Sequence, residues 1–92
     1  MKDIICAAIR NRQRIQFEYN NRQRVAEPQC CGQSHTGKDL LRAYLIAGGS
    51  RPEQLFEIDK IQSFVLLDEH FVSPGPNYKK HDSAMKIIYC QL

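Results

Sequence analysis

The stretch DLLRAYLIAGGSR, residues Asp39–Arg51, is the most strand-like segment of the sequence, and the predicted fold is built around it. Its residues alternate between two largely apolar sets, Leu41, Ala43, Leu45 and Ala47 in one, and Leu40, Arg42, Tyr44 and Ile46 in the other. Apolar residues on both faces are typical of a central strand that is covered on both sides. Arg42 and Tyr44 share one face, so they either reach the rim of the sheet or face a polar pocket.

Four further strands are predicted around this one. RIQFEYN, residues 14–20, alternates strictly between apolar and polar side chains and is typical of a half-buried strand. A second strand around residues 24–31 contains Pro28, which cannot donate to a ladder and so predicts an edge or a bend. Residues 55–58 and 62–68 complete the set. The connections are of hairpin length, which predicts antiparallel pairing.

A helix is predicted at each end of the chain. The first carries an apolar face formed by Ile4, Ile5, Ala8 and Ile9. For the second, Asp82 serves as a cap, and four apolar residues follow at helical spacing: Ala84, Met85, Ile88 and Leu92. The order helix, five strands, helix predicts a mainly β protein with flanking helices. Its sheet is expected to be strongly bent or closed into a small barrel, in a single domain over residues 1–92.

The charge of the chain is unevenly distributed. The 92 residues carry a net charge of only +3. Residues 1–24 hold six basic and two acidic side chains, whereas residues 53–70 hold five acidic side chains and one basic one. Arginine, which dominates the basic part, favours planar partners such as phosphates and carboxylates, although two solvated surfaces of opposite charge are the alternative. No apolar run reaches the roughly 18 residues of a membrane span, so we expect a cytoplasmic protein with no membrane partner.

The four cysteines are expected to be reduced thiols, as is usual for a cytoplasmic chain. Cys6 and Cys90 lie on apolar stripes and are predicted to be small core residues. Cys30 and Cys31 are adjacent, so on a strand they point to opposite faces. Either could begin a metal site with His35, but no CxxC pair completes one. We therefore predict no metal and no cofactor.

The sequence favours binding over catalysis. It contains no nucleophile, metalloprotease or phosphate-loop motif, so no catalytic residue and no enzyme are predicted. Aromatic and cationic side chains lie on or beside the predicted strands: Tyr19, Arg24, Arg42, Tyr44, Arg51 and Lys60. Rings that stack on bases and arginines that contact phosphates together indicate a site for single-stranded nucleic acid or nucleotides. The alternative is that the two tyrosines are core residues whose hydroxyl groups reach the rim.

Five segments, in order along the chain, resemble a WYL domain. LLRAYLIAGGSR followed by LFEIDKIQSFVLLDEHF carries most of the resemblance, and the tripeptide that names the family falls at Ala43-Tyr44-Leu45. The opening helix with AAI, the IQFEY strand, RVAEP and the closing FVSPGPNY are similar as well. The resemblance covers nearly the whole chain.

This resemblance implies an Sm-like five-stranded β-barrel that acts as a ligand sensor in bacterial transcription regulation, often in stress or phage-defence settings. The basic pocket of such domains takes nucleic acid or a nucleotide-like ligand. By position, the resemblance points to Tyr19, Arg24, Arg42, Tyr44 and Lys60 as pocket residues. It adds Ser50, Arg51 and His35 as weaker members.

The sequence departs from the family pattern at three positions, and the departure at Ala43, together with the apolar C-terminal stripe, motivates an alternative function. Ala43 stands where the family has its tryptophan, Glu57 where an arginine is common, and Lys60 in place of another arginine. A reversed charge and a lost guanidinium fork both weaken phosphate binding. The alternative is a protein-interaction or oligomerisation module without a small ligand, which forms a homodimer or binds a regulatory protein through its apolar C-terminal stripe.

Overall fold

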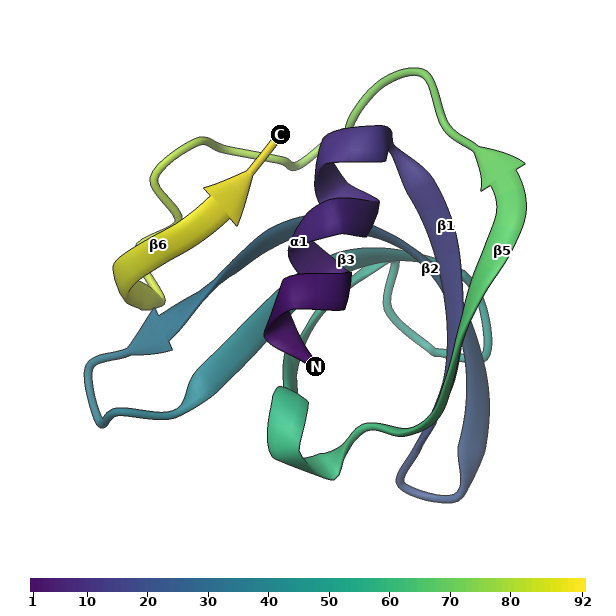
Figure 1. The fold of residues 1–92 in the computed structure, drawn as a ribbon, viewed down its shortest axis with the longest axis horizontal. Helices are drawn as coiled ribbons and strands as arrows, with labels where there is room; N and C mark the ends of the chain where they lie inside the picture. The colour runs from purple at the N-terminus through teal and green to yellow at the C-terminus, as the bar shows by residue number, and fades with distance from the viewer.

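A computed structural model describes all 92 residues as one antiparallel sheet with a single helix packed against it (Figure 1). The elements are α1 (Lys2–Asn11), β1 (Gln13–Tyr19), β2 (Arg22–Ser34), β3 (Asp39–Ala47), β4 (Glu53–Glu57), the 3₁₀ turn η1 (Ile58–Lys60), β5 (Gln62–His70) and β6 (Met85–Gln91). The prediction of a mainly β protein that begins with a helix is therefore confirmed. α1 is too short and too polar to cross a membrane.

The long strand β2 is the hub of the sheet. The strand order is β4-β3-β2-β1-β5, and β6 also pairs with β2. β3 runs along one edge of β2, so β1 and β6 share the other edge, where β1 pairs up to Ala26 and β6 begins at Cys30. Pro28 lies in the interval between these two ladders, next to a register shift in the pairing with β3. The predicted bend at Pro28 is thus confirmed, and its missing N–H falls where β2 changes partners.

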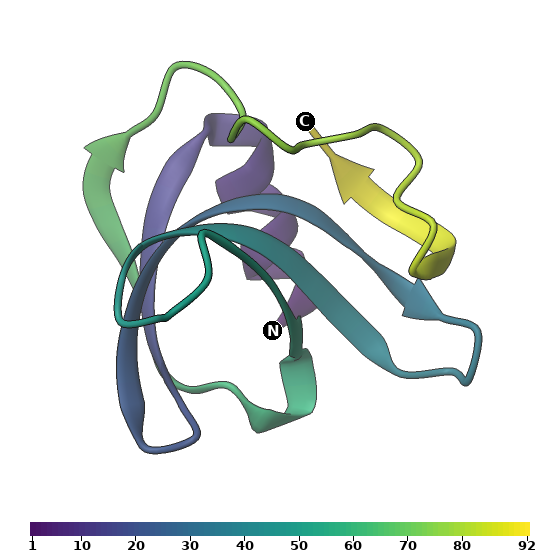
Figure 2. The same cartoon turned by 180° about the vertical axis from the view of Figure 1, so that it is seen from behind.

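The sheet bends around its core but does not close. Its terminal strands, β4 and β5, are joined along the chain by η1 and not by a ladder of hydrogen bonds. Figures 1 and 2 show the strands curling around the space that α1 covers. The alternating strand β1 points Ile15, Phe17 and Tyr19 into this core, as predicted from its pattern. The structure is an open six-stranded sheet, whereas a closed five-stranded barrel was expected.

The predicted C-terminal helix is wrong, because Met85–Gln91 is strand β6. Asp82 does begin a turn, since its carboxylate accepts a hydrogen bond from the Ala84 amide at 3.0 Å. After that turn the chain is extended. Ile87, Ile88 and Tyr89 are residue types that favour strands, and β2 offers them an edge that β1 leaves unpaired. Long-range pairing therefore prevails over the helical spacing of the apolar residues.

Strand β6 brings Cys90 beside the helix, where it forms a disulfide with Cys6. The two Cα atoms lie 5.8 Å apart, and the residues are separated by 84 positions in the sequence. The prediction that both are reduced thiols is wrong, because they are joined by this disulfide. The pairing was not foreseen, because the predicted C-terminal helix would not have placed the two cysteines together. A cross-link that closes nearly the whole chain contributes on the order of 4–5 kcal/mol by restricting the unfolded state.

Candidate ligand site on the outer face of β3

The two faces of β3 have different surroundings. Leu41, Ala43 and Leu45 are buried in the main core. Because side chains alternate along a strand, Arg42 and Tyr44 lie on the opposite, outer face. Residues 71–84, which connect β5 to β6 (Figure 2) and are called the arm below, contact that face at Arg42 and Tyr44.

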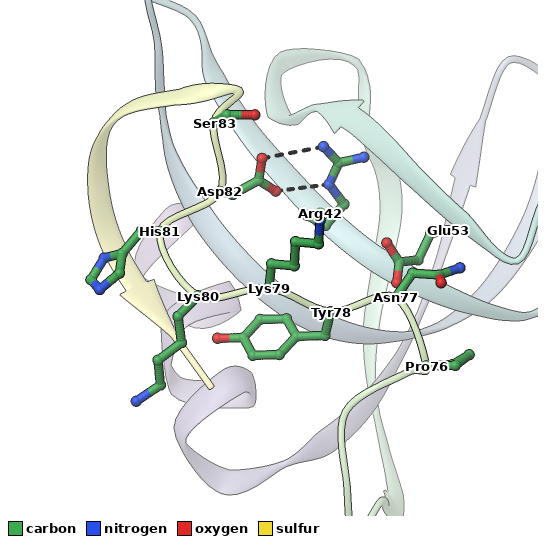
Figure 3. A pocket seen from close by; sticks show the side chains of 10 residues that line it. All are labelled: Arg42, Glu53, Pro76, Asn77, Tyr78, Lys79, Lys80, His81, Asp82 and Ser83. Carbon is green, nitrogen blue, oxygen red and sulfur yellow. Dashed lines mark hydrogen bonds and ion pairs between the residues drawn. The ribbon is translucent and has the colours of Figure 1, made fainter.

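Asp82 of the arm binds Arg42 through two hydrogen bonds (Figure 3). Arg42 Nε lies 2.8 Å from Asp82 Oδ2, and Arg42 Nη2 lies 3.2 Å from Oδ1. The hydrogen bonds to Asp82 raise the pKa of Arg42. Burial opposes ionisation of Asp82, but hydrogen bonds from Arg42 and from the Ala84 amide outweigh it and hold the pKa of Asp82 below its usual value. A charged, two-point contact of this kind fastens the arm to β3.

Gly75 fastens the other part of the arm against Tyr44. A Cβ atom at Gly75 would lie 2.7 Å from Tyr44 Cδ1, so any other residue here would force the ring or the arm to shift. The Gly75 amide also donates a hydrogen bond of 2.8 Å to Oε1 of the fully buried Gln29. The ring of Tyr44 is therefore covered by arm backbone at the place where a base was expected to stack.

Two cavities meet at Arg42. The larger, of about 660 Å³, is lined by Arg42, Glu53 and arm residues 76–83, and only one of its ten lining residues is hydrophobic (Figure 3). The smaller, of about 370 Å³, is lined by Arg42, Ser50, Arg51, Glu53, Gln54 and Leu55. Both volumes fall in the range that small ligands occupy. Four cations, Arg42, Arg51, Lys79 and Lys80, and two carboxylates, Glu53 and Asp82, line the combined space.

Two buried polar atoms near this space have no partner within the protein. They are Glu53 Oε2 and Gln29 Nε2. Glu53 lines both cavities, and Gln29 holds the arm through its other amide atom. Since buried polar groups are nearly always paired, Glu53 Oε2 is an unused acceptor that lines both cavities with Arg42, and Gln29 Nε2 is an unused donor beneath the arm.

Tyr19 and Arg24 do not belong to this site, because they face the core side of the sheet. Tyr19 is 7% exposed and packs edge-on against Phe56, with ring centroids 4.9 Å apart. The buried Arg24 donates to the Tyr19 carbonyl at 3.1 Å and to Gln54 Oε1 at 3.4 Å, and it has no carboxylate partner. Burial, together with the neighbouring Arg22, lowers the pKa of Arg24. The expected convergence of Arg24 with Arg42 and Lys60 is therefore not observed.

The charge of Lys60 is neutralised by Glu57. Its Nζ atom lies 2.7 Å from Glu57 Oε2, and Lys38 Nζ lies 2.8 Å from the other carboxylate oxygen. Hydrogen bonds from Lys38 and then Lys60 lower the pKa of Glu57 to about 2. Lys60 lines neither cavity.

Of the remaining predicted site residues, Ser50 and Arg51 follow β3 and His35 precedes it. Ser50 and Arg51 line the smaller cavity together with Arg42, and Arg51 makes no ion pair or side-chain hydrogen bond. His35 lies in the hairpin before β3, with Nε2 3.4 Å from the Ser83 carbonyl. It touches the base of the arm but lines neither cavity.

The arm supplies the residues that sequence reasoning missed. Lys79 and Lys80, the carboxylate of Asp82, and Tyr78 all line the larger cavity. Tyr78 is held by a hydrogen bond of 2.7 Å from its hydroxyl group to the Leu92 carbonyl. The run YKKHD, residues 78–82, was the available signal, since it combines an aromatic residue with two lysines. Its irregular setting gave no indication that it folds back onto β3.

One group of residues has the composition of a metal site, and it lies away from the cavities. The ligand atoms of Cys6, Cys31 and Cys90 lie within 4.8 Å of one another. Cys30 and Cys31 are buried free thiols, and burial raises their pKa values to about 11 and about 12. Both are therefore protonated at neutral pH.

Comparisons of the chain with protein-family models, with curated proteins and with solved structures give no match.

Proposed function

We propose that the protein is a small regulatory domain that binds an anionic ligand, single-stranded nucleic acid or a nucleotide, on the outer face of β3. The observation that carries the proposal is the position of Arg42 between two polar cavities that also hold Arg51, Lys79 and Lys80. Arginine forks and lysines are the side chains that bind phosphates. Exposed Arg51 has no partner in the protein and is free to make such a contact.

Two residues of the arm, Asp82 and Gly75, compete with the ligand at this site. Lys79 and Lys80 of the same arm line the larger cavity and stay available to the ligand. Asp82 presents two carboxylate oxygens to Arg42, as a phosphate would, and Gly75 lies on Tyr44, where a base would stack. Binding of a phosphate group to the Nε and Nη2 atoms of Arg42 therefore requires Asp82 to leave, and stacking on Tyr44 requires Gly75 to leave. Displacement of the arm would convert ligand binding into a change of shape, which is what a sensor needs.

Glu53 supports recognition of a base as well as of a phosphate. Its unpartnered Oε2 atom lies beside the cations and accepts hydrogen bonds only. Acidic side chains accept from the exocyclic amino group of cytosine, so a base with an amino group is favoured over one without.

The resemblance to WYL domains supports a regulatory role. Tyr44, in the matching tripeptide, lies on the same face as Arg42, and the open bent sheet is compatible with descent from an Sm-like barrel. Within this proposal, the protein is a cytoplasmic bacterial regulator that acts with a transcription factor or another regulatory protein as its partner.

Fluorescence anisotropy with a labelled single-stranded oligonucleotide tests the proposal. We expect Arg42→Ala to raise Kd about 10-fold, and the slope of log K against log salt to fall by about 0.7 because one phosphate contact is lost. Arg10→Ala, which removes an exposed arginine from α1, is the matched control and should bind as the wild type does. Equal affinity of Arg42→Ala and the wild type would refute the site.

A second candidate function, protein interaction, rests on the free edge of β5. Val65 and Leu66 are 46% and 42% exposed, and Val72, just beyond the strand, is 88% exposed. An apolar edge strand is suited to pairing with another strand, from a second copy or another protein. The C-terminal stripe that first suggested this function is used within the fold instead, since Met85 is buried against β2. A dimer by light scattering that Val65→Lys abolishes would favour this function.

A further inference from the structure

Three of the four cysteines come together from three distant parts of the chain. Cys6 lies on α1, Cys31 on β2 and Cys90 on β6, and their sulfur atoms all lie within 4.8 Å of one another. Cys31 and Cys90 are directly opposite each other in the β2–β6 ladder. Cys30 is excluded, because it packs in a separate cluster with Leu40 and Met85. The disulfide uses two of the three sulfurs and leaves a third thiol beside it.

The spacing suits a metal ion as well as a disulfide. Zinc–sulfur bonds are about 2.3 Å long, so sulfurs that share one ion lie roughly 3.8–4.0 Å apart, depending on whether the geometry is tetrahedral or trigonal. A spread of up to 4.8 Å needs only side-chain adjustment to reach this value once the Cys6–Cys90 bond is broken. The backbone already holds the Cα atoms of this pair 5.8 Å apart.

We propose that Cys6, Cys31 and Cys90 form a redox-gated site that holds one soft metal ion when reduced and excludes it when the Cys6–Cys90 disulfide is formed. The inference is independent of the proposed ligand function, since none of the three cysteines lines the cavities at Arg42.

The gating step requires a dithiol reductant. The reductant transfers two electrons and two protons to the Cys6–Cys90 bond, which yields two protein thiols and leaves the reductant as its own disulfide. The metal ion then binds the three sulfurs as thiolates, and their protons pass to solvent. A disulfide oxidant reverses the step: it takes two electrons from the Cys6 and Cys90 thiolates, which form the S–S bond, and becomes a dithiol with two protons from solvent. The ion loses two of its three ligands and is released.

The donor set selects the class of metal. Thiolates prefer Cu(I) and Zn(II) over hard cations such as Mg²⁺ and Ca²⁺. No imidazole or carboxylate belongs to the cluster, and Cys31 is fully buried. Structural zinc sites almost always have four ligands, whereas Cu(I) accepts three sulfurs in a plane. We therefore expect Cu(I) to bind more tightly than Zn(II).

The test is anaerobic titration of the full-length, reduced chain with Cu(I) and, separately, with Zn(II). Native mass spectrometry gives the stoichiometry, and sulfur-to-copper charge-transfer absorption reports the ligands. We expect one ion per chain for the reduced wild type and none for the oxidised protein. Cys31→Ser should weaken binding by about 100-fold or more, because groups that only hydrogen-bond to a ligand already contribute 10- to 100-fold.

Cys30→Ser is the matched control, since it removes the adjacent buried thiol that lies outside the cluster. It should bind one ion with wild-type affinity. Cys31→Ser retains the Cys6–Cys90 disulfide in its oxidised form, so circular dichroism of that form verifies that the variant folds. A reduced chain that unfolds and is refolded by the metal would support the site. Absence of binding, equal binding by Cys31→Ser, or loss of binding in Cys30→Ser would overturn it.

Discussion

The two faces of the sheet use the same kinds of side chain for different purposes: Tyr19 of β1 and Arg24 of β2 lie on the core side, and Arg42 and Tyr44 of β3 on the outer side. On the core side, Arg24 and Tyr19 hydrogen-bond and pack with each other and with Phe56. On the outer side, Arg42 and Tyr44 lie beneath an arm that contacts both, next to two polar cavities. An arginine–tyrosine pair is thus packed into the core on one side, and on the other side it is contacted by the arm. Position relative to the bent sheet, and not residue type, separates the two roles.

The largest expected effect is on stability, from a tryptophan on the core side. Ala43 is fully buried, and overpacking a core typically costs 1–3 kcal/mol. We expect Ala43→Trp, which inserts a whole indole, to lower the free energy of unfolding by about 3 kcal/mol or more. Ile46→Trp is the control on the outer face of the same strand, where Ile46 is 46% exposed, and should change stability by less than about 0.5 kcal/mol. Urea denaturation measures both, and an unaltered Ala43→Trp would mean that the core has room for the family's tryptophan.

Removal of the arginine on the core side should affect folding but not binding. Arg24→Ala loses charged hydrogen bonds to Tyr19 and Gln54, so we expect a loss of about 2 kcal/mol in the free energy of unfolding. Oligonucleotide affinity below the unfolding transition should stay within about twofold of the wild type. Arg42→Ala should weaken binding about 10-fold, and it also removes the stability that the contact with Asp82 contributes. If Arg24→Ala weakened binding as much as Arg42→Ala, the assignment of the two faces would be incorrect.

Release of the arm should strengthen binding on the outer face. Asp82→Asn keeps the shape of the side chain but removes the charge that competes with the ligand for Arg42. We expect its oligonucleotide affinity to rise about 3- to 10-fold, which corresponds to about 1 kcal/mol. Asp68→Asn, at an exposed carboxylate without an ion pair, removes the same charge and should raise the affinity by less than about twofold. Equal gains in the two variants would indicate a general charge effect instead of competition.

Acid should release the arm through the same contact. The pKa of Asp82 is lower in the folded protein than its ordinary value, so the stability it contributes is fully present above that ordinary value, about 4. This contribution is lost as the pH falls through the lower, folded pKa. We therefore expect the Gly75 and Ala84 amide signals in NMR spectra to shift below about pH 4, with Asp82→Asn insensitive over the same range. If the Gly75 and Ala84 amide signals shifted near neutral pH instead, a histidine and not Asp82 would control the release of the arm.

The smallest effect is expected at Lys60, which belongs to neither face. Its ammonium group is exposed and paired with Glu57, and exposed ion pairs contribute little. Lys60→Ala should leave oligonucleotide affinity within about twofold of the wild type and should not measurably change the midpoint of thermal unfolding. A loss of affinity as large as that of Arg42→Ala would extend the site to η1.

Local patterns predicted most of the fold, and long-range contacts account for what they missed. The alternation in RIQFEYN correctly predicted that Ile15, Phe17 and Tyr19 share one face of β1. The alternation in LRAYLIA separated Leu41, Ala43 and Leu45 from Arg42 and Tyr44, but it did not indicate which set faces the core. The C-terminal segment has apolar residues compatible with either period, and the edge of β2 that decides between them lies some 55 residues earlier in the chain. The disulfide went unpredicted for the same reason, because it depends on where β6 lies.

The sequence predicted the part of the site that lies on or next to β3, and it missed the part that the arm contributes. Arg42, Ser50 and Arg51 do line one cavity, since they lie on or directly after a strand whose period is readable from the sequence. Tyr19 and Arg24 were grouped with them because of the resemblance to WYL domains, although the alternation in RIQFEYN already placed Tyr19 on the same face as Ile15 and Phe17. The arm contributes through its tertiary path, which no local pattern encodes.

The most direct test of the central claim, that the ligand binds the outer face of β3, is NMR mapping. The ¹⁵N-labelled chain is titrated with a single-stranded oligonucleotide, and the amide shifts are assigned to residues. We predict that the largest changes fall on Arg42, Tyr44, Arg51 and arm residues 75–83, with Tyr19 and Arg24 little affected. Changes centred on Tyr19 and Arg24, or no changes at all, would contradict the account.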